Sequence, residues 1–195
     1  MAIKSYADTS AVSLAYAFSD AANKDDLPTG TPMNLAPFRD EGFNMAKEAQ
    51  VSAAISNSRR VKGSKNTKGT ASGSLTVEFG GVQFALDMIQ AALMNTWTTH
   101  PDGSMTIYDS NLKQYMVFEK TMRPAGDGAA LEQYHEQYFG TLVNSLNMDM
   151  GDGELMTLAI DTMSAFADYG NSTQGPDGLG GSLATVKNVP ADYEI

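Results

Sequence analysis

The stretch SGSLTVEFGGVQFALDMIQAALMNTW, residues 72–97, decides the fold class because two periodicities meet in it. In residues 72–79 apolar side chains such as Leu75 alternate with polar ones, which predicts a half-buried strand. After two glycines the apolar residues recur every three or four positions, so residues 83–94 are predicted to form a helix. Trp97 comes next, and we expect it to pack in the core near that helix.

The rest of the chain is typical of strands separated by turns. Three Asp-Gly pairs fit turn positions that require positive φ, at residues 102–103, 127–128 and 152–153. Alternating patterns predict strands at residues 42–55, 105–108, 115–121, 134–150 and 154–163. Residues 56–71 are polar, basic and glycine-containing, which favours a long hairpin loop. The sequence therefore predicts a mainly β fold with one flanking α-helix and a long β-hairpin loop.

Three regions are expected along the 195 residues. Residues 1–40 are interpreted as an irregular N-terminal arm, because three prolines interrupt residues 28–37, and Ser10 to Asp20 is a candidate short helix within it. Residues 41–168 form the β-domain. Residues 169–195 are rich in glycine, which predicts a C-terminal extension that is flexible or ordered only by a partner.

Composition narrows the classes of protein. There is no cysteine, which excludes disulfides and thiolate metal sites. No apolar run approaches the length that spans a bilayer, and the first ten residues do not resemble a signal peptide. We therefore expect a protein made in the cytoplasm that does not enter a membrane.

Charge is distributed unevenly within the formal net charge of −10. Residues 49–77 carry +5 and no acid, whereas residues 101–195 carry −10. The acidic body argues against ordinary nucleic-acid binding, which needs cations to displace counterions. The basic segment favours electrostatic complementarity between copies of the chain, and the alternative is a solvated loop. Its bases are Arg59, Arg60, Lys62, Lys65 and Lys68.

No pattern of catalytic, cofactor-binding or metal-binding residues is found, so we do not expect an enzyme. His100 and His135 are interpreted as surface residues, and their spacing does not predict a zinc site. Residues 63–70 resemble a phosphate loop, but Lys68 precedes its glycine instead of following it. The acids of residues 149–154 lack the spacing of a calcium loop, and a hairpin turn explains them better.

Several segments, in order, resemble the siphophage tail tube protein family, also called major tail proteins. The central segment is the stretch at residues 72–97, with its strand, its glycines and its Leu-Met-x-x-Trp ending. The segment before it is AAISNSRRVKGSKNTKG (53–69), and the segments after it are YMVFEKTM (115–122) and YFGTLVNSLNMDM (138–150). The resemblance covers roughly residues 40–165.

The resemblance implies a tail-tube fold, sandwich-like and able to form a barrel with other copies. It implies rings, usually sixfold or pseudo-sixfold, that stack into a tube in the virion. Its lumen passes viral DNA during ejection without binding it specifically. The implied partners are other copies, tape-measure, tail-terminator and tail-tip proteins. The long hairpin is implied to reach an adjacent subunit or ring, which makes the five basic residues candidates for a stacking loop.

One strand face suits a channel wall. It bears acids but no lysine or arginine, so phosphates would slide past it. The candidate lumen-facing residues are Asn44, Glu48, Gln50, Ser52, Ser72, Ser74, Thr76 and Glu78.

Two alternatives stay open. The same fold serves contractile tails and secretion systems, so a tube of that kind is the first. The second is a receptor- or carbohydrate-binding β-module on a virion surface, which would show exposed aromatic side chains. Tyr134 and Tyr138 share a strand face, but a core or subunit contact explains them equally well.

Overall fold

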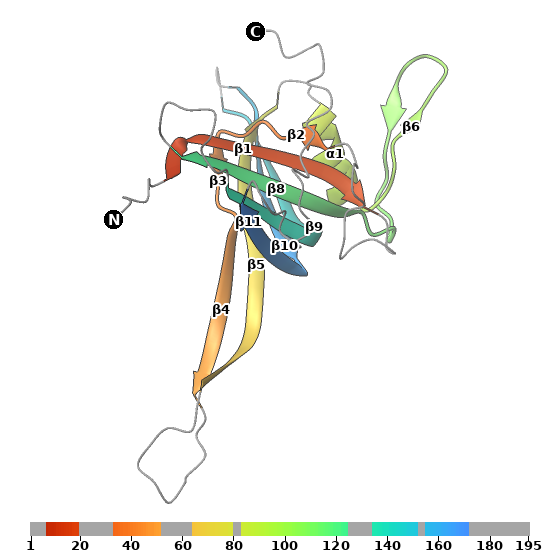
Figure 1. Cartoon of the computed structure of the whole chain (residues 1–195). Coiled ribbons are helices and arrows are strands. Elements are labelled where there is room, and N and C mark those ends of the chain that lie inside the picture. The colour runs from red at the N-terminus through yellow and green to blue at the C-terminus, as the bar shows by residue number, and fades with distance from the viewer. Residues whose placement is uncertain are drawn as a thin grey trace, which may run out of the picture.

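The computed structural model describes residues 7–19, 33–51, 64–79, 83–124, 134–151 and 155–171. Nine strands of these residues form one antiparallel sheet that folds over on itself (Figure 1), which confirms the predicted mainly β fold. We call its first half the N-terminal sheet, which contains β2 (Asn34–Leu35), β1 (Ala7–Ser19), β8 (Tyr115–Pro124), the first part of β9 (Tyr134–Asp149) and β11 (Phe166–Asn171). We call its second half the ribbon sheet, which contains the second part of β9, β10 (Thr157–Ser164), β5 (Ser64–Glu78), β3 (Asp40–Glu41) and β4 (Asn44–Val51).

The two halves meet where β9 changes partners. Up to Thr141, β9 pairs with β8 on one side and β11 on the other, and from Leu142 onward it pairs with β10. Gly140 lies at this change with φ of +57°, a conformation that glycine adopts without strain. The amide of Ala165, between β10 and β11, donates to the carbonyl of Phe139 at 2.9 Å. The sheet therefore bends at Gly140 in β9 and, beside it, at Ala165 between β10 and β11.

The main core lies between the two halves. Phe43 packs against Phe118 and Tyr138, with ring centroids 5.0 and 4.8 Å apart. The ribbon sheet contributes alternating buried residues from β5 and β10, which are Leu75, Val77, Leu158 and Ile160. This burial explains the period of two that the sequence shows in both strands.

One helix covers an end of this core. Helix α1 (Gln83–Ala92) buries one face that includes Phe84 and Met88, and Phe84 meets Tyr16 edge-on at 4.9 Å. The predicted helix is confirmed, although it ends before Met94, which has φ of +51°. Trp97 is half-buried, and its Nε1 donates to the carbonyl of Leu86 at 3.1 Å, so it packs on the helix as predicted.

The N-terminal region differs from its prediction. The sequence predicts a short helix at residues 10–20 in an irregular arm, but β1 is a strand of the N-terminal sheet, between β2 and β8. Leu14 and Tyr16 enter the main core, while Ala15 and Ala17 are buried on the opposite face with Met33. A strand buried on both faces lacks polar alternation, so periodicity does not distinguish it from a helix.

The predicted loop at residues 56–71 is also wrong over part of its length. Strand β5 begins at Ser64 and pairs with β4 through Val51↔Ser64. Residues 46–51 and 64–70, which we call the ribbon, project beyond the body in Figure 1. Their pairing rests on backbone hydrogen bonds, which do not require the apolar alternation that the prediction relied on.

Turns and boundaries agree with the predictions unevenly. Gly103 has φ of +83°, which confirms the turn at Asp102-Gly103, where β6 (Thr98–Thr99) and β7 (Met105–Thr106) form a small hairpin. The Asp-Gly pairs at 127–128 and 152–153 lie outside the described residues. Strand β11 continues to Asn171, past the boundary expected at residue 168, and residues 172–195 are not described.

Among the described helical residues, no segment combines the length and apolar character needed to cross a membrane.

Candidate assembly surfaces

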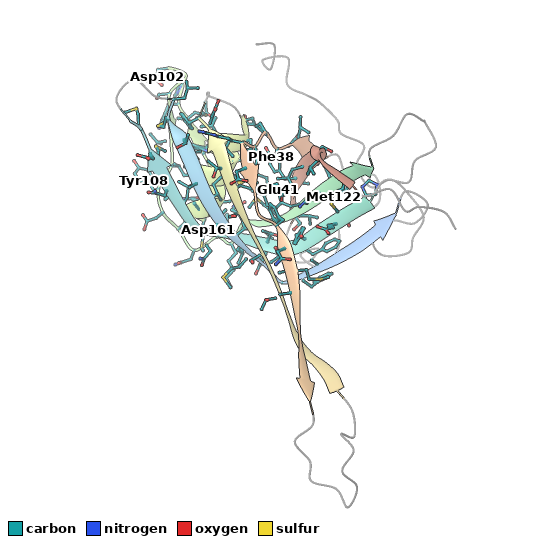
Figure 2. All side chains as sticks on the ribbon, turned by 90° about the vertical axis from the view of Figure 1, so that its left-hand side faces the viewer. Phe38, Glu41, Asp102, Tyr108, Met122 and Asp161 are labelled. Carbon is teal, nitrogen blue, oxygen red and sulfur yellow. The ribbon has the colours of Figure 1, made fainter. Side chains whose placement is uncertain are left out.

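The ribbon sheet leaves one face open to solvent. Strand register places its residues in rows across β5, β10 and β9. One row is Ser74, Asp161 and Ser145, the next is Thr76, Ala159 and Asn147, and the last is Glu78, Thr157 and Asp149. Thr76 and Thr157 are half-buried and the other residues of these rows are exposed. A further row contains Asn44, Ser72 and Met163, and Asp40 lies beside Thr76. We call these four rows together with Asp40 the open face (Figure 2).

The open face contains much of the predicted channel wall. Ser72, Ser74, Thr76 and Glu78 lie along β5, and Asn44 is paired with Ser72 and exposed. Glu48 and Gln50 instead lie on the ribbon, and Ser52 is outside the described residues. The prediction therefore joined two surfaces that the fold separates, one on the body and one on the ribbon.

Strands β10, β9 and β3 add residues to the open face that the predicted channel wall does not include. They are Thr157, Ala159, Asp161, Met163, Ser145, Asn147, Asp149 and Asp40. The alternation of β9 and β10 is visible in the sequence, but it does not reveal that β10 lies beside β5. The charged residues in the described rows from Ser72 to Glu78 are carboxylates, and Arg39, which precedes Asp40, lies near Glu78 at one end of the face.

The predicted stacking residues are only partly described. Arg59, Arg60 and Lys62 lie outside the described residues. Lys65 and Lys68 belong to β5 on the ribbon, where register pairs Lys65 with Gln50 and Lys68 with Glu48. The ribbon thus brings two predicted stacking positions beside two predicted wall positions.

Both edges of the ribbon sheet lack a strand partner among the described residues. From Leu142 to Asp149, β9 pairs with β10 alone, because its pairing with β8 ends at Thr141. At the other edge β3 and β4 pair with β5 alone. Unpaired edges expose rows of backbone donors and acceptors that another chain can satisfy.

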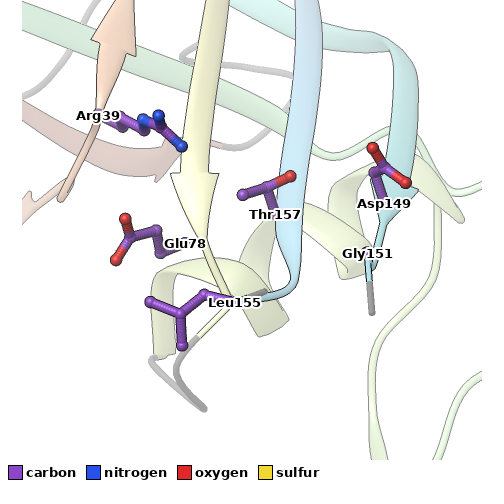
Figure 3. Close-up of a pocket in the computed structure, with 6 residues that line it drawn as sticks. All are labelled: Arg39, Glu78, Asp149, Gly151, Leu155 and Thr157. Atoms are coloured by element: carbon purple, nitrogen blue, oxygen red, sulfur yellow. The ribbon is translucent and has the colours of Figure 1, made fainter. Parts of the chain in front are cut away.

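A cleft of about 470 Å³ lies at the end of the open face farthest from the ribbon. It is lined by Arg39, Glu78, Asp149, Gly151, Leu155 and Thr157 (Figure 3). Glu78 and Asp149 flank Thr157 in one register row, and Leu155 is 69% exposed. The cleft combines carboxylates, one guanidinium and an exposed apolar side chain.

Buried polar groups occupy the far face of the N-terminal sheet. Gln137 Nε2 donates to Glu119 Oε2 at 2.6 Å, and His135 Nδ1 lies 3.0 Å from Thr121 Oγ1 and 3.4 Å from Glu119 Oε1. His135 is 5% exposed, so the prediction of a surface histidine is wrong. Because none of these groups lines the cleft, we assign them to cross-strand pairing of β8 with β9.

An ion pair ties the ribbon sheet to the N-terminal sheet through the core. Lys120 Nζ lies 2.6 Å from Glu41 Oε1, joining β8 to β3. Tyr138 donates its hydroxyl to Glu136, and burial, followed by the Glu136 charge, raises the pKa of Tyr138. Tyr138 is 1% exposed, so it belongs to the core and does not form an open aromatic cleft.

Within the described part of the chain, no three histidine or acidic residues are grouped in a way that would hold a metal ion.

Comparison with known proteins gives one family. The model of the phage tail tube protein family matches residues 9–192. No curated protein matches the chain.

The solved structures that share the fold include two with TM-scores above 0.5. The SPP1 tail tube is 13% identical, with a TM-score of 0.53, and the match covers 95% of this chain and 88% of that one. A protein of the anti-feeding prophage baseplate is 9% identical, with a TM-score of 0.55, covering 86% and 97%. At these sequence identities the two structures show the fold alone. The assignment to a family rests on the family model, whose match spans nearly the whole sequence. The chain belongs to the phage tail tube protein family.

Proposed function

We propose that this protein is the major tube subunit of a siphophage tail, that it forms rings of six copies, and that the stacked rings enclose a channel for viral DNA. The observation that carries the proposal is a ribbon sheet with one open polar face and, within the described part of the chain, two unpaired edges. The role is structural, and no bond is made or broken.

Strand direction supports closure into a ring. Strands β9, β10, β5 and β4 alternate in direction, so the two edge strands β9 and β4 run in opposite directions. If copies are related by rotation about an axis along the strands, β9 of one copy meets β4 or β3 of the next in antiparallel orientation. Such a seam satisfies both edges, and the closed wall has no free edge.

The open face has the chemistry of a channel wall. Its charge comes from Asp40, Glu78, Asp149 and Asp161, and most of its other side chains are small and polar. Phosphates are repelled by these carboxylates, and the guanidinium of Arg39, which lines the cleft at one end of this face, lies beside Glu78 and Asp149. We therefore assign the open face to the lumen, through which DNA passes during ejection.

The same assignment gives partners and location. In a phage tail, tape-measure proteins set the length of the tube, tail-terminator proteins close one end, and tail-tip proteins occupy the other. These proteins are the proposed partners in the virion. Sixfold symmetry is supported by the fold likeness to a protein in the 6-fold symmetrised anti-feeding prophage baseplate.

A tube of a contractile system is the second candidate, because that baseplate protein shares the fold. Micrographs of whole particles separate the two candidates. A sheath around the tube favours the contractile system, and a bare tube favours the siphophage.

Crosslinking tests the ring directly, because the chain has no cysteine of its own. We would combine Asp40→Cys and Asn147→Cys, which occupy one register row at opposite edges, and treat the assembly with a flexible bismaleimide. The expected gel shows a ladder that stops at six subunits, and negative-stain images show rings with a central hole. Each single variant is the control and should stop at dimers. A protein that stays monomeric in both measurements would overturn the proposal.

A further inference from the structure

We infer that a small hairpin on one side of the subunit docks into a hollow on the next copy around the same ring. The hairpin consists of residues 98–113, which contain β6 and β7, and we call it the side hairpin. The hollow has a volume of about 240 Å³ and is lined by Pro37, Phe38, Arg39, Val77 and Glu78. The inference rests on the proposed function, because it names a contact between neighbours in one ring.

The side hairpin is held in one conformation although none of its residues is buried. At its turn, Asp102 Oδ1 accepts hydrogen bonds from the amide and the hydroxyl of Ser104, at 3.0 and 2.7 Å. At its base, the amide of Ser110 donates to the carbonyl of Leu93 at 3.0 Å, just after α1. A projection that is already ordered loses little conformational entropy when it binds a partner.

The side hairpin exposes apolar side chains that the fold of the subunit does not use. Tyr108 is 72% exposed, and Met105 and Leu112 are 44% and 54% exposed. The charged residues Asp109 and Lys113 lie beside them in the chain, and both are exposed. Exposed apolar side chains rimmed by charges are typical of protein interaction surfaces, in which tyrosine is enriched.

The position of the side hairpin identifies its partner as a second copy. The hairpin is attached to the C-terminal end of α1, and α1 packs against β9. Figure 2 shows Tyr108 past β9 on one side of the ribbon sheet and Phe38 on the other side, and Figure 1 places β6 on the β9 side as well. The amide of Arg39 donates to the carbonyl of Thr76 at 2.8 Å, so the hollow borders β5 on the β3 side.

Closure of the ring therefore brings the two features together. The rotation that places the β9 edge of one copy against the β3 edge of the next also carries the side hairpin toward the hollow of that neighbour. The contact joins unlike surfaces, and it repeats around the ring until the ring closes.

The chemistry of the two surfaces is complementary. The hollow has apolar walls and two charged residues, Arg39 and Glu78. The side hairpin brings an opposite charge for each of them, Asp109 and Lys113. Among the described residues Arg39 has no ion-pair partner within its own chain, and a guanidinium also attracts an aromatic ring such as that of Tyr108. Such complementarity fixes orientation and partner choice more than it adds affinity.

Disulfide formation tests the contact, because the chain has no cysteine of its own. We would mix the single variants Arg39→Cys and Asp109→Cys, let rings assemble and oxidise them mildly. A disulfide requires Cα atoms within about 7 Å of each other, so docked neighbours should give covalent dimers, and either variant alone should stay monomeric on the gel. The control mixture of Arg39→Cys with Asp161→Cys should give no dimer, because Asp161 of β10 lies one strand inside the β9 edge.

Truncating one apolar side chain measures how much the contact contributes to assembly. Tyr108→Ser should raise the protein concentration at which half of the chains are in rings by about tenfold or more, as expected for an aromatic anchor of an interface. The control Met163→Ser removes an apolar side chain that is 60% exposed on the open face, away from the hollow, and should leave this concentration unchanged. Analytical ultracentrifugation measures both.

The measurements separate failure of this contact from failure of the proposed function. Negative-stain images and the bismaleimide ladder first establish that rings form. Rings of the mixed variants without disulfide dimers, or a Tyr108→Ser variant that assembles as the wild type does, would overturn the contact and leave the ring intact. If Arg39→Cys prevents ring formation, Pro37→Cys takes its place in the hollow with the same expected dimers. A wild-type protein that forms no rings would overturn the proposed function itself.

Discussion

The two halves of β5 obey different rules. From Ala71 to Glu78 the strand lies in the body, with Leu75 and Val77 buried and the alternate side chains on the open face. From Ser64 to Thr70 it pairs only with β4 and contains lysines, threonines, an asparagine and a glycine. An isolated two-stranded ribbon is marginally stable, so the body holds the ribbon in place. One strand therefore combines a half that builds the fold with a half that is left for contact.

Removing the ribbon is the most severe way to test this division. Residues 47–69 are replaced by Asn-Gly, which joins the cross-strand partners Ala46 and Thr70 through a tight type I′ turn. We expect tubes to disappear, because the proposed stacking contact of the ribbon is removed. The free energy of unfolding should change by about 1 kcal/mol or less, as for surface changes away from the core. Electron microscopy and urea denaturation measure the two effects.

A shorter replacement refines this result. Exchanging only residues 52–63 for Asn-Gly joins Val51 to Ser64 and keeps Lys65 and Lys68, but it removes Arg59, Arg60 and Lys62. Tubes from this variant assign stacking to the ribbon strands, and their loss assigns it to the three removed bases. Tubes that persist without residues 47–69 would contradict the division of β5.

Truncating one side chain in each half compares their energies. Leu75 is 1% exposed in the main core, so Leu75→Ala should lower the free energy of unfolding by about 2–5 kcal/mol. Thr70 is exposed on the ribbon, and Thr70→Ala should change it by about 0.5 kcal/mol or less. Urea denaturation of both variants checks the difference. Equal losses would mean that the ribbon also stabilises the body.

A glycine in the body half of β5 leaves room for an aromatic ring of the core. A Cβ on Gly73 would collide with the ring of Phe43, which is held between Phe118 and Tyr138. Gly73→Ala should therefore cost about 1–3 kcal/mol of stability through overpacking. Gly42→Ala is the matched control, because its Cβ would press on the hydroxyl of the exposed Ser74, which is free to rotate. Thermal unfolding of the two variants should separate them clearly, and similar melting temperatures would show that Phe43 yields to the added methyl group.

The same division explains how much of the fold is predictable. The body half of β5 and helix α1 are predicted correctly because burial on one side imposes a period of two or of 3.6. The sequence predicts a loop at the ribbon because residues 64–70 show no apolar alternation. It misses strand β1 for the opposite reason, since Ala15 and Tyr16 are buried on opposite faces. Local patterns report burial on one face of an element, and they give no signal where a strand has no apolar side or two apolar sides.

Residues of the open face could be predicted from the sequence only where they lie on the same strand. The wall residues of β5 follow from its own alternation. Asp149 and Asp161 join them only because β10, which pairs with β9 in a local hairpin, also pairs with β5, from which it is far apart in the sequence. The cleft needs Arg39 as well, which arrives from before β3. Such juxtapositions depend on tertiary pairing, and no local spacing records them.

The smallest expected effect is a pH dependence of stability, and it comes from the end of the body away from the ribbon. Asp87 of α1 is buried there, with 8% of its surface exposed. Tyr16 donates its hydroxyl to Asp87 Oδ2 at 2.6 Å, and Gln83 donates to Oδ1 at 2.7 Å. Burial raises the pKa of Asp87 above its ordinary value of 3.8, and the two hydrogen bonds oppose the rise without cancelling it. The folded protein thus holds this proton more tightly than the unfolded chain does.

The sign of the pH dependence follows from that difference. The stability contributed by protonated Asp87 is complete below pH 3.8 and is lost as the pH rises through the raised pKa of the folded state. Asp87→Asn cannot ionise, so the free energy of unfolding of the wild type minus that of the variant should fall as the pH rises from 3.8. Urea denaturation across that range measures it. Tyr16→Phe removes a hydrogen bond that opposes the rise, so in that background the fall should be larger and should extend to higher pH. A wild type that gains stability over Asp87→Asn with rising pH would show that the hydrogen bonds to Asp87 outweigh its burial. This end of the core would then accommodate a charged carboxylate.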